Sequence, residues 1–400
     1  MEIQPSISCD VLIVGTGLSG LSAALGFASR GFSVLCAGTD PPSGLNVANN
    51  SRGVVILGRN VSFLENLSVK LCDIPSSTPV TQLSLSSHKY DDKAPVPRRD
   101  WLFLPQDIGC KLFGYHISNT NLYRNLLEQA TLDHRITKLS PVKVKTLYAR
   151  TNGVSALLNT GEKINSHLVV GADGASSFIR TNAGIRSFGK RLNQGILVFC
   201  ITHEHTHNNT AHEIYTSGGA LTFIPLQDTH KSSVIWMDSK RSISSFQHLN
   251  IEHFTTLLQK KSGGVLGQIH LDTPIQLVKP SQPHCAKTFI AKRTALIGEA
   301  AHVFPPIGAQ GLNTSLQDIA ILLDCVDEAQ KAGKDIGIDS SLQQYNQARR
   351  NEVFLKFTLL STLNMMSMND GFFGHFLRSL GMDILERATP IRKKIMQFGM

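Results

Sequence analysis

A glycine-rich turn near the N-terminus constrains the fold of this chain more than any other feature. The turn, Gly15–Gly20, follows the short apolar run Asp10–Val14 and leads into a helical stretch, Leu18–Arg30. Such a run is typical of a buried parallel strand. Gly31 is a natural helix stop before a second strand over Phe32–Ala37. This order predicts a strand–helix–strand unit at the start of the chain.

The same turn is typical of a site for a dinucleotide. Its glycines let the backbone turn tightly and approach a pyrophosphate, and the helix that follows offers unpaired N–H groups. The pattern alone is weak, but its place between a strand and a helix argues against chance. The residues expected to contact the dinucleotide here are Gly15, Gly17, Leu18, Ser19 and Gly20.

The second strand lacks the acidic residue that usually ends it and holds the adenosine ribose. Ala37 occupies that place, and Asp40 follows a few residues later. Asp40 either takes over the ribose contact or begins a turn before Pro41 and Pro42. The third alternative is that other groups hold the ribose.

Length and composition admit a core large enough to enclose a cofactor. The 400 residues are 42% hydrophobic and 17% charged. At roughly 100–200 residues per domain, this length predicts two or three units, or one nucleotide domain with an inserted partner. The net charge of +9 favours an anionic partner, such as nucleic acid, acidic lipid or a phosphate-bearing cofactor, or else describes a solvated basic surface.

The cysteines and histidines predict neither a metal site nor a disulfide framework. Seven cysteines lie scattered without a C-x-x-C pair, which fits free thiols in a reducing compartment. His203, His205 and His207 would share one face of a strand, but a solvated strand end or loop is the favoured interpretation. No secretory signal and no run of about 18 apolar residues is visible, so we expect a cytoplasmic protein.

Local patterns predict the remaining elements. Residues 40–110 are mostly irregular, with a helix near Val61–Leu67, and a second helix covers Asn121–Ala130. A hairpin over Val142–Thr160 turns at Asn152-Gly153. The chain is therefore expected to be α/β, in three parts. These are a discontinuous Rossmann-like nucleotide domain (1–75, 108–187 and 278–345), a β-rich substrate domain (76–107 and 188–277) and a helical C-terminal region (346–400).

Further segments resemble the motifs of one flavoprotein family. Arg52–Leu64 resembles the early arginine segment of flavin aromatic hydroxylases, and Gly171–Gly174 resembles their short second motif. Gly298–His302 with Pro305–Asn313 resembles their flavin-binding signature. The chain is most similar to the ubiquinone-biosynthesis hydroxylases of the para-hydroxybenzoate hydroxylase superfamily. Segments similar to that subfamily also include Gly219–Pro225, Trp236 and Phe376–Met396.

The resemblance implies that the dinucleotide is FAD. Arg52 would contact its pyrophosphate, and Asn119 would face the flavin or else cap a helix. Asp173 would touch FAD and its own turn, or be a purely structural turn residue. Glu299 stands where the family has Asp and would bind the ribityl chain, or simply sit at a helix start. The other FAD contacts implied are Gly298, Gly308, Gly311, Leu312 and Asn313.

In that family the loop at Pro305–Gly308 would face the isoalloxazine ring. Pro305 and Pro306 stiffen it, while Gly308 lets the backbone come close to the ring. These three are the expected catalytic-loop residues. His302 would be either a base or, as we favour, a structural residue beneath the flavin. The interpretation requires that the N-terminal turn and this segment enclose one cofactor.

The resemblance also implies a reaction. Reduced FAD would react with O₂ to give a C4a-hydroperoxide, protected from water, that hydroxylates the ring of a polyprenyl phenol. NADPH or NADH would be the reductant, or an electron carrier would replace it. Three alternatives remain: another small aromatic substrate, a flavin-dependent reductase or halogenase, and a non-catalytic FAD-binding scaffold of a biosynthetic complex.

The C-terminal part mixes apolar and basic side chains. This pattern suits a helix on an anionic membrane surface, although packing against the FAD domain is the favoured interpretation for residues 353–368. A lipid-tailed substrate would make peripheral contact with the inner membrane sensible. The expected partners are therefore this phenol, O₂, an anionic membrane and other ubiquinone-pathway proteins, without nucleic acid.

Overall fold

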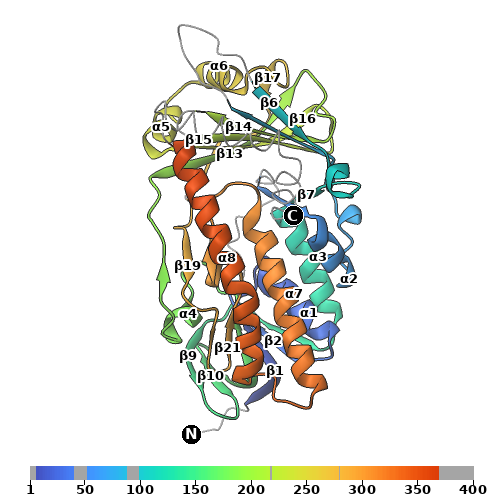
Figure 1. Ribbon diagram of the computed structural model, residues 1–400, viewed down its shortest axis with the longest axis vertical. Helices are drawn as coiled ribbons and strands as arrows, with labels where there is room; N and C mark the ends of the chain where they lie inside the picture. Colours follow the sequence, from blue (N-terminus) through green and yellow to red (C-terminus); the bar gives the residue numbers. More distant parts are fainter. Residues whose placement is uncertain (1–5, 40–51, 88–98, 217–218, 279, 369–400) are drawn as a thin grey trace.

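A sheet of mostly parallel strands forms the core of the larger part of the molecule (Figure 1). The computed structural model describes residues 6–39, 52–87, 99–216, 219–278 and 280–368. The strand order is β20-β21-β11-β1-β2-β8, parallel from β21 to β8, and the hairpin β9–β10 pairs with β11. The bounds are β1 Ile7–Val14, β2 Val34–Ala37, β8 Ile136–Leu139, β9 Val144–Ala149, β10 Val154–Leu158, β11 Lys163–Gly171, β20 Ile290–Ala291 and β21 Thr294–Leu296.

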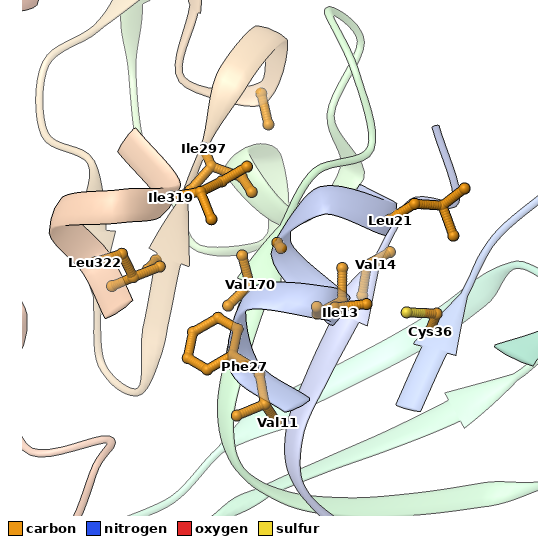
Figure 2. Close-up of a cluster of buried hydrophobic side chains, with 14 of the residues drawn as sticks. Val11, Ile13, Val14, Leu21, Phe27, Cys36, Val170, Ile297, Ile319 and Leu322 are labelled. Carbon is orange, nitrogen blue, oxygen red and sulfur yellow. The ribbon is translucent and has the colours of Figure 1, made fainter. Parts of the chain in front are cut away.

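Buried apolar runs place these strands at the centre. Val11–Ile13 is completely buried, as expected for a parallel strand that is covered on both faces. A Cβ on Gly26 would lie 2.5 Å from a methyl carbon of Leu323, so two helices pack closely here. Figure 2 shows Phe27 of α1 beside Val170 of the sheet, within the cluster of buried hydrophobic side chains that forms this core. The helices of this part are α1 Leu18–Ser29, α3 Asn119–Leu132, α7 Gln310–Lys331 and α8 Asp339–Met368.

A second large sheet lies at the other end of the molecule, at the top of Figure 1. Its order is β17-β13-β16-β15-β14-β5-β6, with β18 also on β13; all pairs are antiparallel except β14–β5. Phe254 and Ile243 pack two helices onto its outer face, against Trp236. The bounds are β5 Gln82–Ser87, β6 Arg99–Phe103, β13 Gln194–His203, β14 Thr210–Thr216, β15 Gly219–Pro225, β16 Lys231–Ser239, β17 Ile269–Leu271, β18 Gln276–Val278, α5 Lys240–Phe246 and α6 Ile251–Ser262.

Two three-stranded sheets complete the described residues. Their orders are β3-β7-β4 and β12-β19-β22, and both are antiparallel. The bounds are β3 Gly53–Leu57, β4 Thr78–Val80, β7 Gly114–Ser118, β12 Ser187–Phe188, β19 His284–Ala286, β22 His302–Val303, α2 Gly58–Asn66, α4 Phe178–Asn182 and the 3-10 turns η2 Leu71–Asp73, η3 Pro105–Ile108 and η4 Gly298–Ala300.

The fold class predicted from the sequence is confirmed, with one local correction. The described residues contain the Rossmann-like sheet, the β-rich second sheet and the long helix α8. The prediction that residues 40–110 are mostly irregular was wrong, because β3 to β6 lie there. β3, β4 and β5 pair with strands that are distant in the sequence, which local patterns do not reveal. β4 pairs with β7, so the strands that join the second sheet begin at Gln82 rather than near residue 76.

Candidate cofactor and substrate site

Four loops follow the carboxyl ends of neighbouring strands in the first sheet. Gly15–Gly20 follows β1, Gly38 follows β2, Ala172–Gly174 follows β11, and Gly298 comes after β21. These four strands are adjacent and parallel. Because ligands of open α/β sheets bind beyond the carboxyl ends of the strands, this edge is the candidate cofactor site.

The Gly15–Gly20 turn leaves no room for side chains on its inner side. Gly15 has φ +119°, and a Cβ there would lie 2.2 Å from the carbonyl oxygen of Ala172. A Cβ on Gly20 would lie 2.0 Å from the carbonyl oxygen of Gly15. Gly17, in contrast, is exposed and meets nothing within 4 Å. The first turn of α1 has no side-chain cap and no acidic residue among the described residues, so its N–H groups can receive an anion.

The segment after β21 meets this turn directly. Gly298 has φ +56°, and a Cβ there would lie 3.1 Å from the hydroxyl oxygen of Ser19. On its other side the same Cβ would lie 2.9 Å from the hydroxyl oxygen of Ser315 in α7. The N-terminal turn and the segment beginning at Gly298 are therefore neighbours in space, as one shared cofactor requires.

Glu299 places a carboxylate at this edge. Although its side chain reaches solvent, the protein around it desolvates the carboxylate enough to raise its pKa, while nearby His302 acts in the opposite direction. Because the Glu299 side chain is exposed, a ligand can reach its carboxylate. Its oxygens can accept hydrogen bonds from hydroxyl groups, despite the extra methylene relative to Asp.

Asp173 organises the turn after β11. One of its carboxylate oxygens accepts a hydrogen bond from the Ser177 hydroxyl, and the other accepts from the Ile179 N–H at 3.0 Å. Asp173 thus fixes the entry to α4. Asp173 therefore has the structural role in its own turn that the sequence analysis gave as one alternative. Any contact of Asp173 with FAD would be made in addition to these hydrogen bonds.

Arg52 and Asn119 lie side by side at the start of β3 and α3. The Asn119 N–H donates to the Arg52 carbonyl at 3.0 Å. The cap of α3 is Ser118, whose hydroxyl accepts from the Asn121 N–H, so Asn119 is not the cap. The Asn119 side-chain oxygen is buried and finds no partner among the described residues. Such a buried acceptor points to a missing donor, which a bound cofactor can supply.

The loop before α7 presents its backbone to this edge. Pro305 and Ile307 are buried, whereas Pro306, Gly308 and Ala309 are exposed. Gly308 has φ +68° and Ala309 has φ +53°, so the chain turns sharply into the helix. Helix α7 begins at Gln310 without a side-chain cap among the described residues. Its first N–H groups, with exposed Gly311 and half-buried Leu312, form a second positive helix end.

The side chain of Asn313 serves the protein itself. Its oxygen accepts hydrogen bonds from the Leu57 N–H and the Asn60 amide, at 2.8 and 2.9 Å. Its nitrogen donates to the carbonyls of Val55 and Ala309, at 2.7 and 2.8 Å. Asn313 therefore ties α7 to β3 and α2, and only its backbone remains for a ligand. Asn60 was missed because no local pattern marks it.

A buried network of His302, Asp318 and Arg349 holds the segment that begins at Gly298. His302 Nε2 lies 2.6 Å from one oxygen of Asp318, which also accepts from the Gly298 N–H at 3.1 Å. The other Asp318 oxygen accepts from Arg349 Nε at 2.8 Å. Burial would raise the pKa of Asp318, but His302 and Arg349 together lower it. His302 also packs against Phe304, with ring centroids 4.9 Å apart.

The histidines near the end of β13 lie partly inside the protein. His203 and His207 are buried rather than solvated, so that part of the prediction was wrong. His203 contacts the His205 carbonyl and the Ser232 hydroxyl, and His207 contacts the Leu226 carbonyl. Among the residues that the structure describes, no cluster of metal-ligating side chains occurs. Asp40 lies outside the described residues.

These features fit FAD. Two uncapped helix ends, Gly17 open to solvent, and the unpartnered acceptor on Asn119 lie along one sheet edge or beside it. A pyrophosphate suits the first helix end, and the ring suits the exposed loop at Gly308. In the described ranges, no helix combines the length and apolar character needed to cross a membrane.

Comparison with known proteins agrees with this site. The family description "FAD binding domain" matches residues 8–353. Ubiquinone hydroxylase UbiL of Rhodospirillum rubrum is 29% identical, over 98% of this chain and 89% of its own length. The 3-demethoxyubiquinol 3-hydroxylase of Escherichia coli is 26% identical over 100% of both chains. The crystal structure of p-nitrophenol 4-monooxygenase PnpA from Pseudomonas putida shares the fold, with a TM-score of 0.73, 15% identity and coverage of 98% and 97%.

Proposed function

This chain belongs to the family of proteins with an FAD binding domain, and we propose that it is an FAD-dependent monooxygenase acting in ubiquinone biosynthesis. Its substrate would be a polyprenyl phenol, which it hydroxylates on the aromatic ring. The observation that carries the proposal is the meeting of the Gly15–Gly20 turn with the segment from Gly298 to Gly311 at one sheet edge. Similarity to two ubiquinone-pathway hydroxylases over nearly the whole chain supports this substrate class.

The residues that would hold FAD lie on several elements. The N-terminal turn and Arg52 suit the pyrophosphate, because both offer N–H donors to an anion. Glu299 suits the ribityl hydroxyls, and the first turn of α7 suits the flavin ring. The full proposed set is Gly15, Gly17, Leu18, Ser19, Gly20, Arg52, Asn119, Asp173, Gly298, Glu299, Gly308, Gly311, Leu312 and Asn313.

Bound FAD would supply the redox chemistry, taking electrons from a reductant and activating O₂. The protein's own task is to bind, orient and exclude water. The positive end of α7 would stabilise negative charge on the ring near Gly308. Buried Ile307, with Pro305, would close the loop against water. His302 would act by positioning, because its ring is buried and bonded to Asp318.

Two finer features belong to the same proposal. NADPH or NADH would deliver electrons from a transient site, since the one glycine-rich turn is assigned to FAD. The first sheet, with β3-β7-β4, would form the cofactor domain, and the second sheet would form the substrate domain.

Peripheral membrane contact would bring the enzyme to a lipid-tailed substrate. Helix α8 supports this, because one side of it packs on the protein while Leu355, Leu359 and Leu363 remain 46–51% exposed. At four-residue spacing these leucines share one face of the helix. An exposed apolar stripe on a chain with net charge +9 suits an anionic membrane surface.

The test is direct. Purified protein should be yellow, and with NADPH or NADH and an alkyl phenol it should consume O₂ and release a product one oxygen atom heavier. O₂ uptake without that product would favour an uncoupled oxidase. A coloured protein without uptake would favour a non-catalytic scaffold, and hydroxylation restricted to phenols without a tail would favour another aromatic substrate. Colourless protein that does not take up FAD would remove the proposal.

A further inference from the structure

The short segment between β12 and β13 runs along α8, because both of its ends are fixed to that helix. At one end, the Phe188 ring packs against Phe354 and Phe357, with its centroid 5.6 and 5.7 Å from theirs. At the other end, Gln194 and Asn364 share two buried amide hydrogen bonds. The segment that joins these two anchors must therefore follow the last turns of α8.

This segment carries exposed cations. Lys190 and Arg191 both reach solvent, and neither belongs to an ion pair within the described ranges. The Lys240 N–H donates to the Asn193 carbonyl at 3.0 Å, so the start of α5 lies next to the segment. There Lys240 and Arg241 are exposed as well. Four cations therefore lie close together beside the C-terminal half of α8.

Two more cations extend this group toward the start of α8. Arg350 of α8 donates from Nε to the carbonyl of exposed Lys287 at 2.6 Å. Figure 1 shows β19, which ends just before Lys287, beside the length of α8, and α5 beside its red end. From Arg350 to Asn364 the helix rises about 21 Å, so the cations form an extended row rather than a pocket. The cation row consists of Lys190, Arg191, Lys240, Arg241, Lys287 and Arg350.

The cation row has little negative charge beside it. The segments 186–194 and 239–251 contain no Asp or Glu. Helix α8 itself has Asp339 at its first residue and Glu352, which pairs with the buried Arg349 at 2.7 Å. Most of the charge of the row therefore remains available to an external anionic surface, and salt would screen that attraction.

Apolar side chains of α8 lie directly beside the cation row. Phe354, which touches Phe188, is 46% exposed. Met365, about three turns further along the same side of the helix, is 55% exposed. The exposed leucines from Leu355 to Leu363 continue this solvent side of α8. Exposed apolar side chains flanked by Lys and Arg are typical of a helix that lies at a membrane–water boundary.

We propose that the cation row binds the anionic headgroups of a lipid bilayer while the exposed apolar side chains of α8 enter the bilayer surface. The proposal rests on the proposed function, which gives the enzyme a lipid-tailed substrate. It adds the class of lipid and the orientation, with α8 parallel to the membrane. An extended row suits many headgroups side by side better than it suits one small anion.

The test is co-sedimentation of the FAD-loaded, full-length protein with vesicles. Wild type should bind vesicles of phosphatidylcholine and phosphatidylglycerol more tightly than vesicles of phosphatidylcholine alone, and added salt should weaken this binding. Lys190→Gln with Arg191→Gln should weaken binding to the anionic vesicles roughly tenfold or more and leave binding to the neutral vesicles unchanged. Lys143→Gln with Lys145→Gln is the matched control, because it removes the same charge from exposed residues at β9, far from α5 in Figure 1.

A second pair of substitutions covers a failure of the first. If the first variant does not retain FAD, Lys240→Gln with Arg241→Gln decides, with the same loss expected. The proposal is overturned if wild type binds both kinds of vesicle equally, or if the control loses as much binding as the variants of the row. It is also overturned if wild type binds neither vesicle and forms dimers that these substitutions dissociate, because the row would then join two copies of this chain.

The same proteins separate this proposal from the proposed function. Each would be supplied with a reductant and a short-chain alkyl phenol that needs no membrane. Hydroxylation of that phenol without any preference for anionic vesicles would support the proposed function and overturn the role of the cation row. Vesicle binding that depends on the row, without hydroxylation of any phenol, would do the reverse.

Discussion

At the scale of single residues, neighbouring glycines in one turn have different reasons to be glycine. Gly20 faces inward, where a Cβ would lie 2.0 Å from a backbone oxygen. Gly17 faces outward, has φ −78° and meets nothing within 4 Å. Its backbone conformation suits any residue. Only a ligand that lies close to the backbone would explain why this position lacks a side chain.

Replacing these two glycines by alanine should therefore give opposite results. Gly20→Ala should destabilise the apoprotein by about 2 kcal/mol or more, because the backbone must shift. Gly17→Ala should leave the thermal midpoint of the apoprotein nearly unchanged but weaken FAD binding about tenfold or more. Thermal unfolding without FAD and titration with FAD measure the two effects. If Gly17→Ala bound FAD as tightly as wild type, the pyrophosphate would not lie at this turn.

Lys356 gives a prediction about pH. Its side chain is 3% exposed, and burial lowers its pKa to about 8, against the opposing effect of Glu352. Because the folded-state pKa lies below the unfolded value, the cost of charging Lys356 is present below pH 8 and disappears as pH rises toward 10.5. Lys356→Met should remove a cost of roughly 3 kcal/mol at pH 7, reduced by the lost contact with Thr314.

The measurement is the difference in unfolding free energy between Lys356→Met and wild type, from urea titrations at several pH values. This difference should move in favour of wild type between pH 8 and 10. Lys331→Met, on an exposed side chain, serves as the control for removing a positive charge. A difference that stays constant over this range would mean that Lys356 is not shifted.

At the scale of elements, the two sides of α8 differ in burial. One side is held by Arg349, Val353 and Phe357, which are buried against the protein. The other side exposes Leu355, Leu359 and Leu363. The packing predicted for residues 353–368 is thus present, and the exposed stripe lies on the same helix.

The stripe should determine association with lipid. The double substitution Leu359→Ser and Leu363→Ser should reduce flotation with anionic liposomes severalfold and change stability little, because both side chains are exposed. Leu132→Ser, on a 74% exposed residue of α3, should float like wild type. Equal flotation of all three proteins would exclude this stripe as the contact.

At the scale of the whole molecule, α8 also joins the two large sheets, along which it runs in Figure 1. Gln194 at the start of β13 and Asn364 on α8 form a buried reciprocal pair, with amide hydrogen bonds of 3.0 and 3.1 Å. Replacing either residue by an apolar one would leave the buried amide of the other without its partner. This pair fixes the second sheet to the helix that supports the cofactor edge.

A double-mutant cycle tests that connection. Asn364→Leu and Gln194→Leu should each cost about 1–3 kcal/mol, because the remaining amide is buried and unpaired. The double variant should cost less than the sum of the single variants, since no unpaired amide remains. Urea unfolding measures all four proteins. Strictly additive costs would show that the two amides do not depend on each other.

The sequence predicted the features that are local, and it failed where contacts join distant segments. Gly15–Gly20 and Pro305–Gly311 are continuous motifs, so both could be located and related to one cofactor. Asp318 and Arg349 lie 31 residues apart on two helices, and no spacing links them to His302.

The parallel pairing of β5 with β14 has a consequence for synthesis of the chain. Hairpin β5–β6 is complete by residue 103, but its partner β14 begins only at residue 210. At roughly 5–20 residues per second, the ribosome takes about 5–20 seconds to make the stretch between them. During that delay the hairpin has an open hydrogen-bonding edge, to which another nascent chain can add. Slower translation between these points should therefore lower the yield of native protein more than slowing after residue 240, because by then β14 is available to pair with β5.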